Sequence, residues 1–385
     1  MRRDLSQPVS IGIVTALVGF TSSFAVVLAG LRGVGANTAQ AASGLAILCL
    51  LQGVGMLWLT WRHRTPLTLA WSTPGAALLA TQGYVNGGWP AAVGAFLVTG
   101  ALIVATGLWG RLGRLIAAIP TPIAQAMLAG VLVTLCLEPF KMLAVSPWLV
   151  APLIVVWVVM QRISQRWATP AAFAVALAIM LVAAVRDGGI PVVLPHLSLT
   201  APSFTWSAVL GLALPLYVVT MASQNVPGVA VLRAAGYSVP WRETMLVTGV
   251  TTMAGATAGG HALNLAAITA ALPASPESHP DPKRRWIATA TTGWAYLAIA
   301  AGAASLTALV AIAPAGIVES VAGLALLATL ATALGGALRE PGDRIPAVMT
   351  MLLAASGVSV FGVGAAFWAL LVGLAARRVL GGRPR

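Results

Sequence analysis

The stretch of sequence that decides the fold is Leu67-Thr-Leu-Ala-Trp-Ser-Thr-Pro-Gly-Ala-Ala-Leu-Leu-Ala80. It begins as a β-type run that ends at Trp71, and Ser72-Thr-Pro74 is typical of a helix start, with a hydroxyl cap and an early proline. The apolar helix that follows reaches only about Tyr84, roughly half of the ~30 Å hydrocarbon core. A half-helix that begins inside a membrane directs its free N–H groups and positive dipole end at the midplane. The stretch therefore predicts an anion site that needs no charged side chain.

Composition places the chain in a membrane. Of its 385 residues, 59% are hydrophobic and 8% are charged, and the mean hydropathy is +0.92. These values indicate a polytopic membrane protein surrounded by lipid. The net charge of +13 comes from basic residues in short loops, so we expect no nucleic-acid partner. Cys49 and Cys136 lie in apolar runs, which favours buried thiols, and we expect no metal site.

Apolar runs divide the chain into fourteen expected segments. The third and the tenth are too short to span a membrane. The segments cover 11–31, 38–61, 74–84, 90–108, 121–137, 147–161, 170–185, 207–232, 242–258, 262–272, 286–311, 315–338, 345–358 and 361–377.

The basic residues test this topology. With the N-terminus inside, Arg32, Lys141 and Arg186 are the only three of the 22 Lys and Arg residues that fall on the outer side. Such an asymmetry follows the positive-inside rule, and it places both termini in the cytoplasm.

The two halves of the chain resemble each other weakly. Gly12 and Gly211 open long segments, and Thr21 and Thr220 each follow nine residues later. The short segment is third in each set of seven, and an odd number of segments inverts the second copy. Inverted repeats with interrupted helices predict a secondary transporter whose site lies at the repeat interface.

Two polar stretches are candidates for the site. The tenth segment carries Gly259-Gly-His261 and Asn264, and the spacing of His261 and Asn264 predicts one helix face. His261 could accept a proton near the midplane, or it could be a neutral histidine bound to a carbonyl. The eighth segment carries Gln224 and Asn225, which could bind a carboxylate or cap a distortion around a proline.

Weaker candidates lie elsewhere. Thr21, Ser22 and Phe24 are repeat-related to the eighth segment; Phe24 could pack an aromatic ligand or simply face lipid or core. Glu319 is the most membrane-embedded carboxylate, and it could be a proton site, part of an outer gate or a structural residue. The sequence contains no catalytic triad, phosphate loop or dinucleotide fingerprint, so neither an enzyme nor a cofactor is expected.

Three motifs carry a family resemblance. They are Trp71-Ser-Thr-Pro-Gly-Ala76, Gln224-Asn-Val-Pro-Gly228 and Gly259-Gly-His-Ala-Leu-Asn264. Together they resemble the BenE family of benzoate/proton symporters, whose fold is similar to that of nucleobase–ascorbate and sulfate-permease transporters.

The resemblance implies an architecture. It implies an all-α polytopic membrane protein of seven-plus-seven inverted repeats, with short strands before half-helices three and ten. A core domain would comprise 1–115 and 205–313, and a gate domain 116–204 and 314–385. It further implies elevator-like motion, a homodimer and the bacterial inner membrane. Nucleobase-carrying relatives use glutamates on segments eight and ten, where this chain has Gln224 or Asn225 and His261 or Asn264.

The resulting hypothesis is benzoate held between two converging half-helix starts. Its carboxylate would take N–H groups near Thr73, Gly75 and Gly260, and its ring would pack on Phe24. Further binding residues would be Thr21, Ser22 and Ser72, with polar contacts from Gln224, Asn225, His261 and Asn264. A proton would travel on His261 or Glu319. The alternatives are an uncoupled anion channel of the same fold, a transporter for another substrate such as a nucleobase, and, least expected, a membrane-embedded enzyme.

Overall fold

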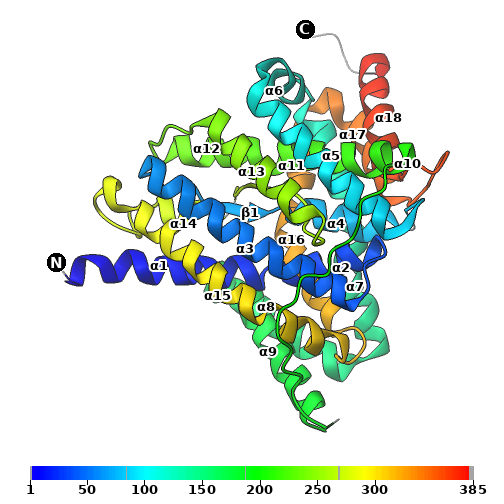
Figure 1. Cartoon of the computed structure of the whole chain (residues 1–385). Helices are drawn as coiled ribbons and strands as arrows, with labels where there is room; N and C mark the ends of the chain where they lie inside the picture. The colour runs from blue at the N-terminus through cyan, green and yellow to red at the C-terminus, as the bar shows by residue number, and fades with distance from the viewer. Residues whose placement is uncertain (1, 84, 187, 268, 381–385) are drawn as a thin grey trace.

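The protein is mostly helical, with one small sheet at its centre (Figure 1). The computed structural model describes residues 2–83, 85–186, 188–267 and 269–380. The helices are α1 (Arg2–Thr21), α2 (Phe24–Gly33), α3 (Thr38–His63), α4 (Thr73–Gln82), α5 (Gly88–Leu108), α6 (Gly110–Ala117), α7 (Thr121–Val145), α8 (Pro147–Ile163), α9 (Gln165–Arg186), α10 (Trp206–Ala208), α11 (Leu214–Thr220), α12 (Val226–Ala234), α13 (Trp241–Ala256), α14 (Ala271–Ala274), α15 (Trp286–Ala311), α16 (Ile317–Ala337), α17 (Arg344–Ala355) and α18 (Ala365–Leu380). The strands are β1 (Leu69–Trp71) and β2 (Leu263–Leu265); η1 (Val209–Ala213) and η2 (Met221–Asn225) are π-helical, and η3 (Pro282–Arg284) and η4 (Pro341–Asp343) are 3₁₀ turns.

Eight helical stretches in the described part of the chain are long and apolar enough to span a membrane. They are Leu5–Gly33, Thr38–His63, Gly88–Leu108, Thr121–Val145, Gln165–Arg186, Trp206–Ala234, Pro282–Ala311 and Ile317–Ala337. The protein is therefore a polytopic membrane protein. Four further helices, α8, α13, α17 and α18, have only 17, 16, 12 and 16 residues. Their length alone does not establish that they span the membrane, so the expected number of fourteen segments stays a prediction. The short α6 was not expected from the apolar runs.

The predicted start of the first half-helix is confirmed. Strand β1 ends at Trp71, and Ser72 caps α4 by accepting the N–H of Gly75 at 3.1 Å. Helix α4 has ten residues, about 15 Å, so it crosses only part of a bilayer. The expected end of this helix, Tyr84, lies outside the described residues.

The short strands that the family resemblance implied before the two half-helices are confirmed as β1 and β2, but the expected half-helix over 262–272 is wrong in its first part and in its length. Its start is the strand β2, and helix α14 has only four residues; Ile268, between them, lies outside the described residues. The strand forms because β1 offers an antiparallel partner, with Ala70 opposite Asn264, and pairing satisfies backbone groups that lack water inside a membrane. His261 and Asn264 therefore do not share a helix face.

Two long segments are interrupted near the sheet. Helix α1 ends at Thr21 and α2 begins at Phe24, which leaves Ser22 and Ser23 between them. On the eighth segment, the π-helical turn η2 separates α11 from α12 and carries Gln224 and Asn225. Such π-helical turns occur often at functional sites.

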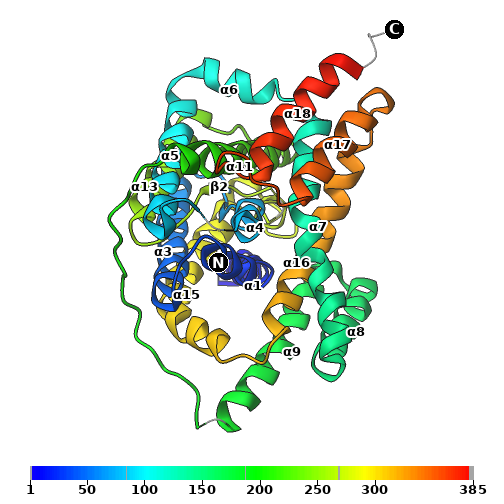
Figure 2. The ribbon, with the colours of Figure 1, turned by 90° about the vertical axis from the view of Figure 1, so that its right-hand side faces the viewer.

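Glycines allow the helices around the sheet to approach closely. A Cβ on Gly53 of α3 would lie 2.8 Å from the carbonyl oxygen of Gly293 on α15. Likewise, a Cβ on Gly249 of α13 would lie 2.8 Å from the carbonyl oxygen of Gly100 on α5. Figure 2 shows these four helices on one side of the molecule and α7, α8, α16, α17 and α18 on the other.

Candidate functional site: a cavity at the start of the half-helix

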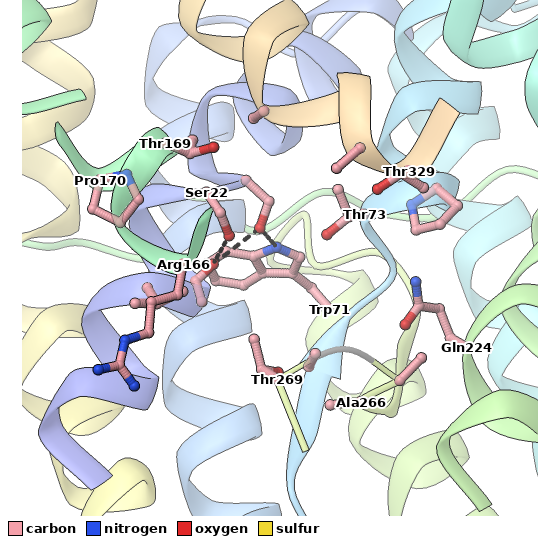
Figure 3. Close-up of a pocket in the computed structure, with 18 of the residues that line it drawn as sticks. Ser22, Trp71, Thr73, Arg166, Thr169, Pro170, Gln224, Ala266, Thr269 and Thr329 are labelled. Atoms are coloured by element: carbon pink, nitrogen blue, oxygen red, sulfur yellow. Dashed lines mark hydrogen bonds between the residues drawn. The ribbon is translucent and has the colours of Figure 1, made fainter. Parts of the chain in front are cut away.

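A cavity of about 210 Å³ lies where β1 gives way to α4 (Figure 3). This volume is smaller than the ~300–1,000 Å³ of pockets for drug-sized ligands, so the cavity suits a small molecule. Its walls come from α1, the α1–α2 turn, β1, α4, η2 and the chain after β2 on one side, and from α9 and α16 on the other; α15 contributes Tyr296.

The start of α4 provides a backbone donor. The N–H of Gly75 is bound to Ser72 Oγ, and the N–H of Ala76 is bound to the Ser72 carbonyl at 2.7 Å. Pro74 has no N–H. Thr73 is thus the first-turn residue whose N–H has no partner among the described residues, and its side chain lines the cavity. The positive end of the α4 dipole adds to the attraction for an anion.

An aromatic wall stands beside this donor. The ring of Trp71 lies edge-on to the ring of Tyr296, with centroids 5.8 Å apart, and both residues line the cavity. The indole N–H of Trp71 donates to Ser23 Oγ at 2.8 Å, and Phe20 packs against its ring at 5.9 Å. Trp71 is therefore held in one orientation and presents apolar surface to a ligand.

Polar groups complete the cavity. Hydroxyls of Ser22, Thr169, Thr269 and Thr329 and the amide of Gln224 surround the same space (Figure 3). The Gln224 side chain makes no hydrogen bond to another described residue, so its amide is free to bind a ligand. The charge balance is simple: among the described residues that line the cavity, Arg166 alone is charged, and no carboxylate is present.

Of the residues predicted for the site, Ser22, Thr73 and Gln224 line the cavity. The others lie outside its lining. Thr21 donates to the carbonyl of Leu17 within its own helix. Phe24 is buried between Phe20 and Phe173, with ring centroids 5.3 and 4.6 Å away.

Two N–H groups that were expected to bind an anion already have partners. Ser72 Oγ takes that of Gly75, and the Gly255 carbonyl takes that of Gly260 at 2.9 Å. The expected pair of helix ends is also wrong, because a four-residue α14 lacks the aligned peptide dipoles of a full helix. Of the two expected half-helix starts, the geometry leaves only that of α4 at this cavity.

Asn225 and Asn264 form hydrogen bonds with the backbone of strand β2. The Oδ1 of Asn225 accepts the N–H of Leu265 at 2.9 Å, on the edge of β2 that β1 does not cover. Asn264 donates to the carbonyl of Leu265 at 2.9 Å, and its own Oδ1 is buried without a partner in the described structure.

The two predicted proton carriers lie away from the cavity. His261 is fully buried beside Phe96, with ring centroids 6.5 Å apart, and neither ring nitrogen has a well-aligned partner in the part of the chain that the structure describes. A protonated imidazole in that place would lack the polar partners that a buried charge requires. Glu319 is exposed in the first turn of α16, whereas Thr329 of the same helix lines the cavity.

Among the lining residues that the sequence did not single out are Trp71, Arg166, Thr269, Tyr296 and Thr329. Trp71 directly precedes the helix cap, so its place at the start of the half-helix was a usable signal. Arg166, Tyr296 and Thr329 come from α9, α15 and α16, and only the tertiary structure brings these helices to the cavity.

Comparisons with known proteins agree with this architecture. The profile of the family described as "BenE: Benzoate membrane transport protein" matches residues 4–379. The inner membrane protein YdcO of Escherichia coli (strain K12) is 39% identical over 367 residues, which cover 94% of this chain and 93% of that protein. The benzoate membrane transport protein of Acinetobacter baylyi is 28% identical over 382 residues, covering 99% and 97% of the two chains.

Solved structures show the same fold. The transmembrane domain of the cyanobacterial bicarbonate transporter BicA aligns with a TM-score of 0.61 at 13% identity, over 97% of this chain and 98% of that one. The structure of SLC26A9 aligns with a TM-score of 0.63, also at 13% identity, over 96% of this chain and 64% of that one. The resemblance that the three motifs carry is thus confirmed, and the chain is a membrane transporter, not an enzyme, that belongs to the BenE family.

Proposed function

We propose that this protein is a secondary active transporter that imports benzoate, or a closely related aromatic carboxylate, together with protons. The observation that carries the proposal is the cavity itself: among the residues that the structure describes, a helix start with an unpartnered N–H faces an aromatic wall, and the lining holds no carboxylate. A planar ring needs apolar contact, and its carboxylate needs donors. Both are present within one small space.

In this proposal the carboxylate binds at the start of α4. It accepts hydrogen bonds from the N–H and hydroxyl of Thr73 and from the amide of Gln224, with Ser22 nearby. The ring packs on Trp71 and Tyr296. Behind this layer, Ser72 and Gly75 shape the helix start, and the hydrogen bond from Leu265 to Asn225 holds the sheet.

The remaining predicted residues support the site from outside the cavity. Thr21 and Phe24 fix the end of α1 and the start of α2, and Gly260, His261 and Asn264 form the approach to β2 and its centre. His261 and Glu319 stay the candidates for the proton. Because His261 is enclosed, a role in coupling requires that another conformation opens its surroundings to water.

We further propose an elevator mechanism. The core domain (1–115 and 205–313) would slide against the gate domain (116–204 and 314–385). Supporting this, the most extensive helix contacts pair α3 with α15, α13 with α5, and α16 with α7, each within one proposed domain. The cavity has walls from both, so a relative movement would change its access.

The proposed setting is the bacterial inner membrane, with both termini in the cytoplasm, fourteen segments in two inverted repeats and a homodimeric assembly. The name of the relative YdcO, an inner membrane protein, supports the location. In this orientation Gln165 and Arg166 mark a cavity mouth on the cytoplasmic side.

Uptake into liposomes tests the proposal. Purified protein is reconstituted, a pH gradient is imposed, and the accumulation of radiolabelled benzoate is measured against protein-free liposomes, because benzoic acid crosses lipid unaided. Benzoate is expected to reach a higher concentration inside the liposomes than outside. Flux that only follows the benzoate gradient would instead identify an uncoupled anion pathway, and competition by uracil but not by substituted benzoates would identify a nucleobase carrier.

Coupling is then assigned with two variants. His261→Gln and Glu319→Gln are compared for pH-driven accumulation and for benzoate exchange without a gradient. The variant that loses accumulation and keeps exchange has lost the proton carrier.

A further inference from the structure

Arg166 is the one charged residue in the described lining of the cavity, and because its side chain is also 49% exposed, we take its position as the mouth of the cavity. It belongs to the first turn of α9, and about half of its side chain is exposed. Figure 3 shows its guanidinium turned away from the ring of Trp71. The side chain thus touches the cavity while its charge points elsewhere.

The charge points to Glu277. Nη1 of Arg166 lies 3.6 Å from Oε2 of Glu277, and the two side chains are 49% and 69% exposed. Exposed pairs of this kind contribute little stability, so another anion can replace one partner. Glu277 itself is held in place, because its backbone carbonyl accepts a hydrogen bond from Gln7 of α1 at 2.7 Å.

Helix stability does not explain a cation at this position. The N-terminal turn of a helix has the positive end of the dipole, which disfavours Arg166 there. The positive-inside rule accounts for basic residues in this loop in general, and Arg162 meets it equally well four residues earlier. What distinguishes Arg166 from Arg162 is contact with the cavity.

We propose that Arg166 determines specificity for anions at the mouth of the cavity, where the substrate carboxylate displaces Glu277 from its guanidinium. Arg166 attracts the carboxylate and orients it towards Thr73, while Glu277 competes for the same charge and so weakens binding. This inference rests on the proposed function, since it takes an aromatic carboxylate as the ligand.

The test is equilibrium binding of radiolabelled benzoate to detergent-purified protein, by scintillation proximity, for wild type and four variants. Arg166→Gln is expected to weaken binding about fivefold to tenfold, and Arg166→Lys to recover part of the loss. The matched control Arg162→Gln removes the same charge from the same loop and is expected to bind as wild type. Glu277→Gln is expected to tighten binding about twofold to fivefold.

A double variant tests whether Glu277 acts on binding through Arg166. In the Arg166→Gln background, Glu277→Gln should have no effect on binding, because its competitor role needs the guanidinium. The difference between wild type and Arg166→Gln should also shrink as salt rises from 0.05 M to 0.5 M. Elution as a single species with an unchanged melting temperature shows that each variant is folded.

The outcomes separate this inference from the proposed function. Wild-type binding with equal affinities for Arg166→Gln and Arg162→Gln would overturn the role of Arg166 and leave the benzoate proposal standing. A tightening by Glu277→Gln that persists in the Arg166→Gln background would also overturn it. If folded wild-type protein binds no benzoate, both proposals fall together.

Discussion

The hydroxyl of Thr220 donates a hydrogen bond to Oγ of Ser72 at 2.8 Å, and this same oxygen accepts the N–H of Gly75. One serine therefore caps the half-helix α4 and ties it to the last residue of α11, just before the π-helical turn that carries Gln224. The half-helix α4 and the interrupted eighth segment, which both contribute to the cavity, are joined at this point.

Removing either partner should loosen that junction. Ser72→Ala loses a helix cap and the acceptor for Thr220, which should destabilise the protein by about 1–2 kcal/mol. Thr220→Val loses one buried hydrogen bond, about 0.6–1 kcal/mol. Melting temperatures of the single and double variants in detergent measure both effects. The double variant should lose less than the sum, and strict additivity would argue against a shared junction.

The neighbouring amides on η2 should behave oppositely. Gln224→Leu is expected to weaken benzoate binding at least fivefold and to change stability by less than about 0.5 kcal/mol, because this side chain faces the cavity. Asn225→Leu should cost about 1–3 kcal/mol, because it leaves the buried N–H of Leu265 without a partner. Binding isotherms and thermal unfolding of both variants check the contrast, and the reverse pattern would exclude this division of roles.

Part of this arrangement was predictable from local sequence. Ser72-Thr-Pro74 specifies a helix start by itself, since a hydroxyl cap and an early proline act within one turn. The glycines and prolines also marked the interrupted segments. These are short-range effects that depend on few neighbours.

The second strand was implied by the family resemblance, but it was not predictable from its own residues. Leu263-Asn-Leu265 is a short run that fits a helix or a strand, and it is a strand because β1, far away in the sequence, pairs with it. The same holds for Tyr296 and Thr329, which reach the cavity through the packing of α15 and α16. No hydrophobic periodicity or motif in the sequences of α15 and α16 indicates that packing.

Close helix contacts give a prediction about stability. Gly249→Ala would place a Cβ 2.6 Å from Val104 Cγ2 and 2.8 Å from the Gly100 carbonyl oxygen. Because the backbone of Gly100 cannot move away easily, we expect the free energy of unfolding to fall by about 1–3 kcal/mol. A lower melting temperature would show this loss. Gly302→Ala on α15 is the matched control: its Cβ would meet nothing within 4 Å, and the gain in helix propensity should stabilise the protein by up to about 1 kcal/mol. Equal effects in the two variants would show that contact distance is not the cause.

The aromatic wall yields the last prediction, which separates two candidate partners for a substrate ring. Trp71 lines the cavity and is fixed by its hydrogen bond to Ser23, whereas Phe24 is buried between Phe20 and Phe173. Trp71→Ala should therefore weaken benzoate binding about tenfold, because an aromatic pair contributes about 0.5–1.5 kcal/mol beyond the apolar area that it buries. Trp71→Phe keeps a ring but loses the bond to Ser23, so an intermediate affinity is expected.

Phe24→Leu is the control for this series. It keeps an apolar side chain in a packed position, so stability should fall by about 1.5 kcal/mol or less while benzoate affinity stays within twofold of wild type. Equilibrium binding across the three variants, each checked for folding by thermal unfolding, provides the comparison. Should Phe24→Leu weaken binding as much as Trp71→Ala does, the ring must reach Phe24, and the cavity would have to extend behind the α1–α2 turn when substrate is bound.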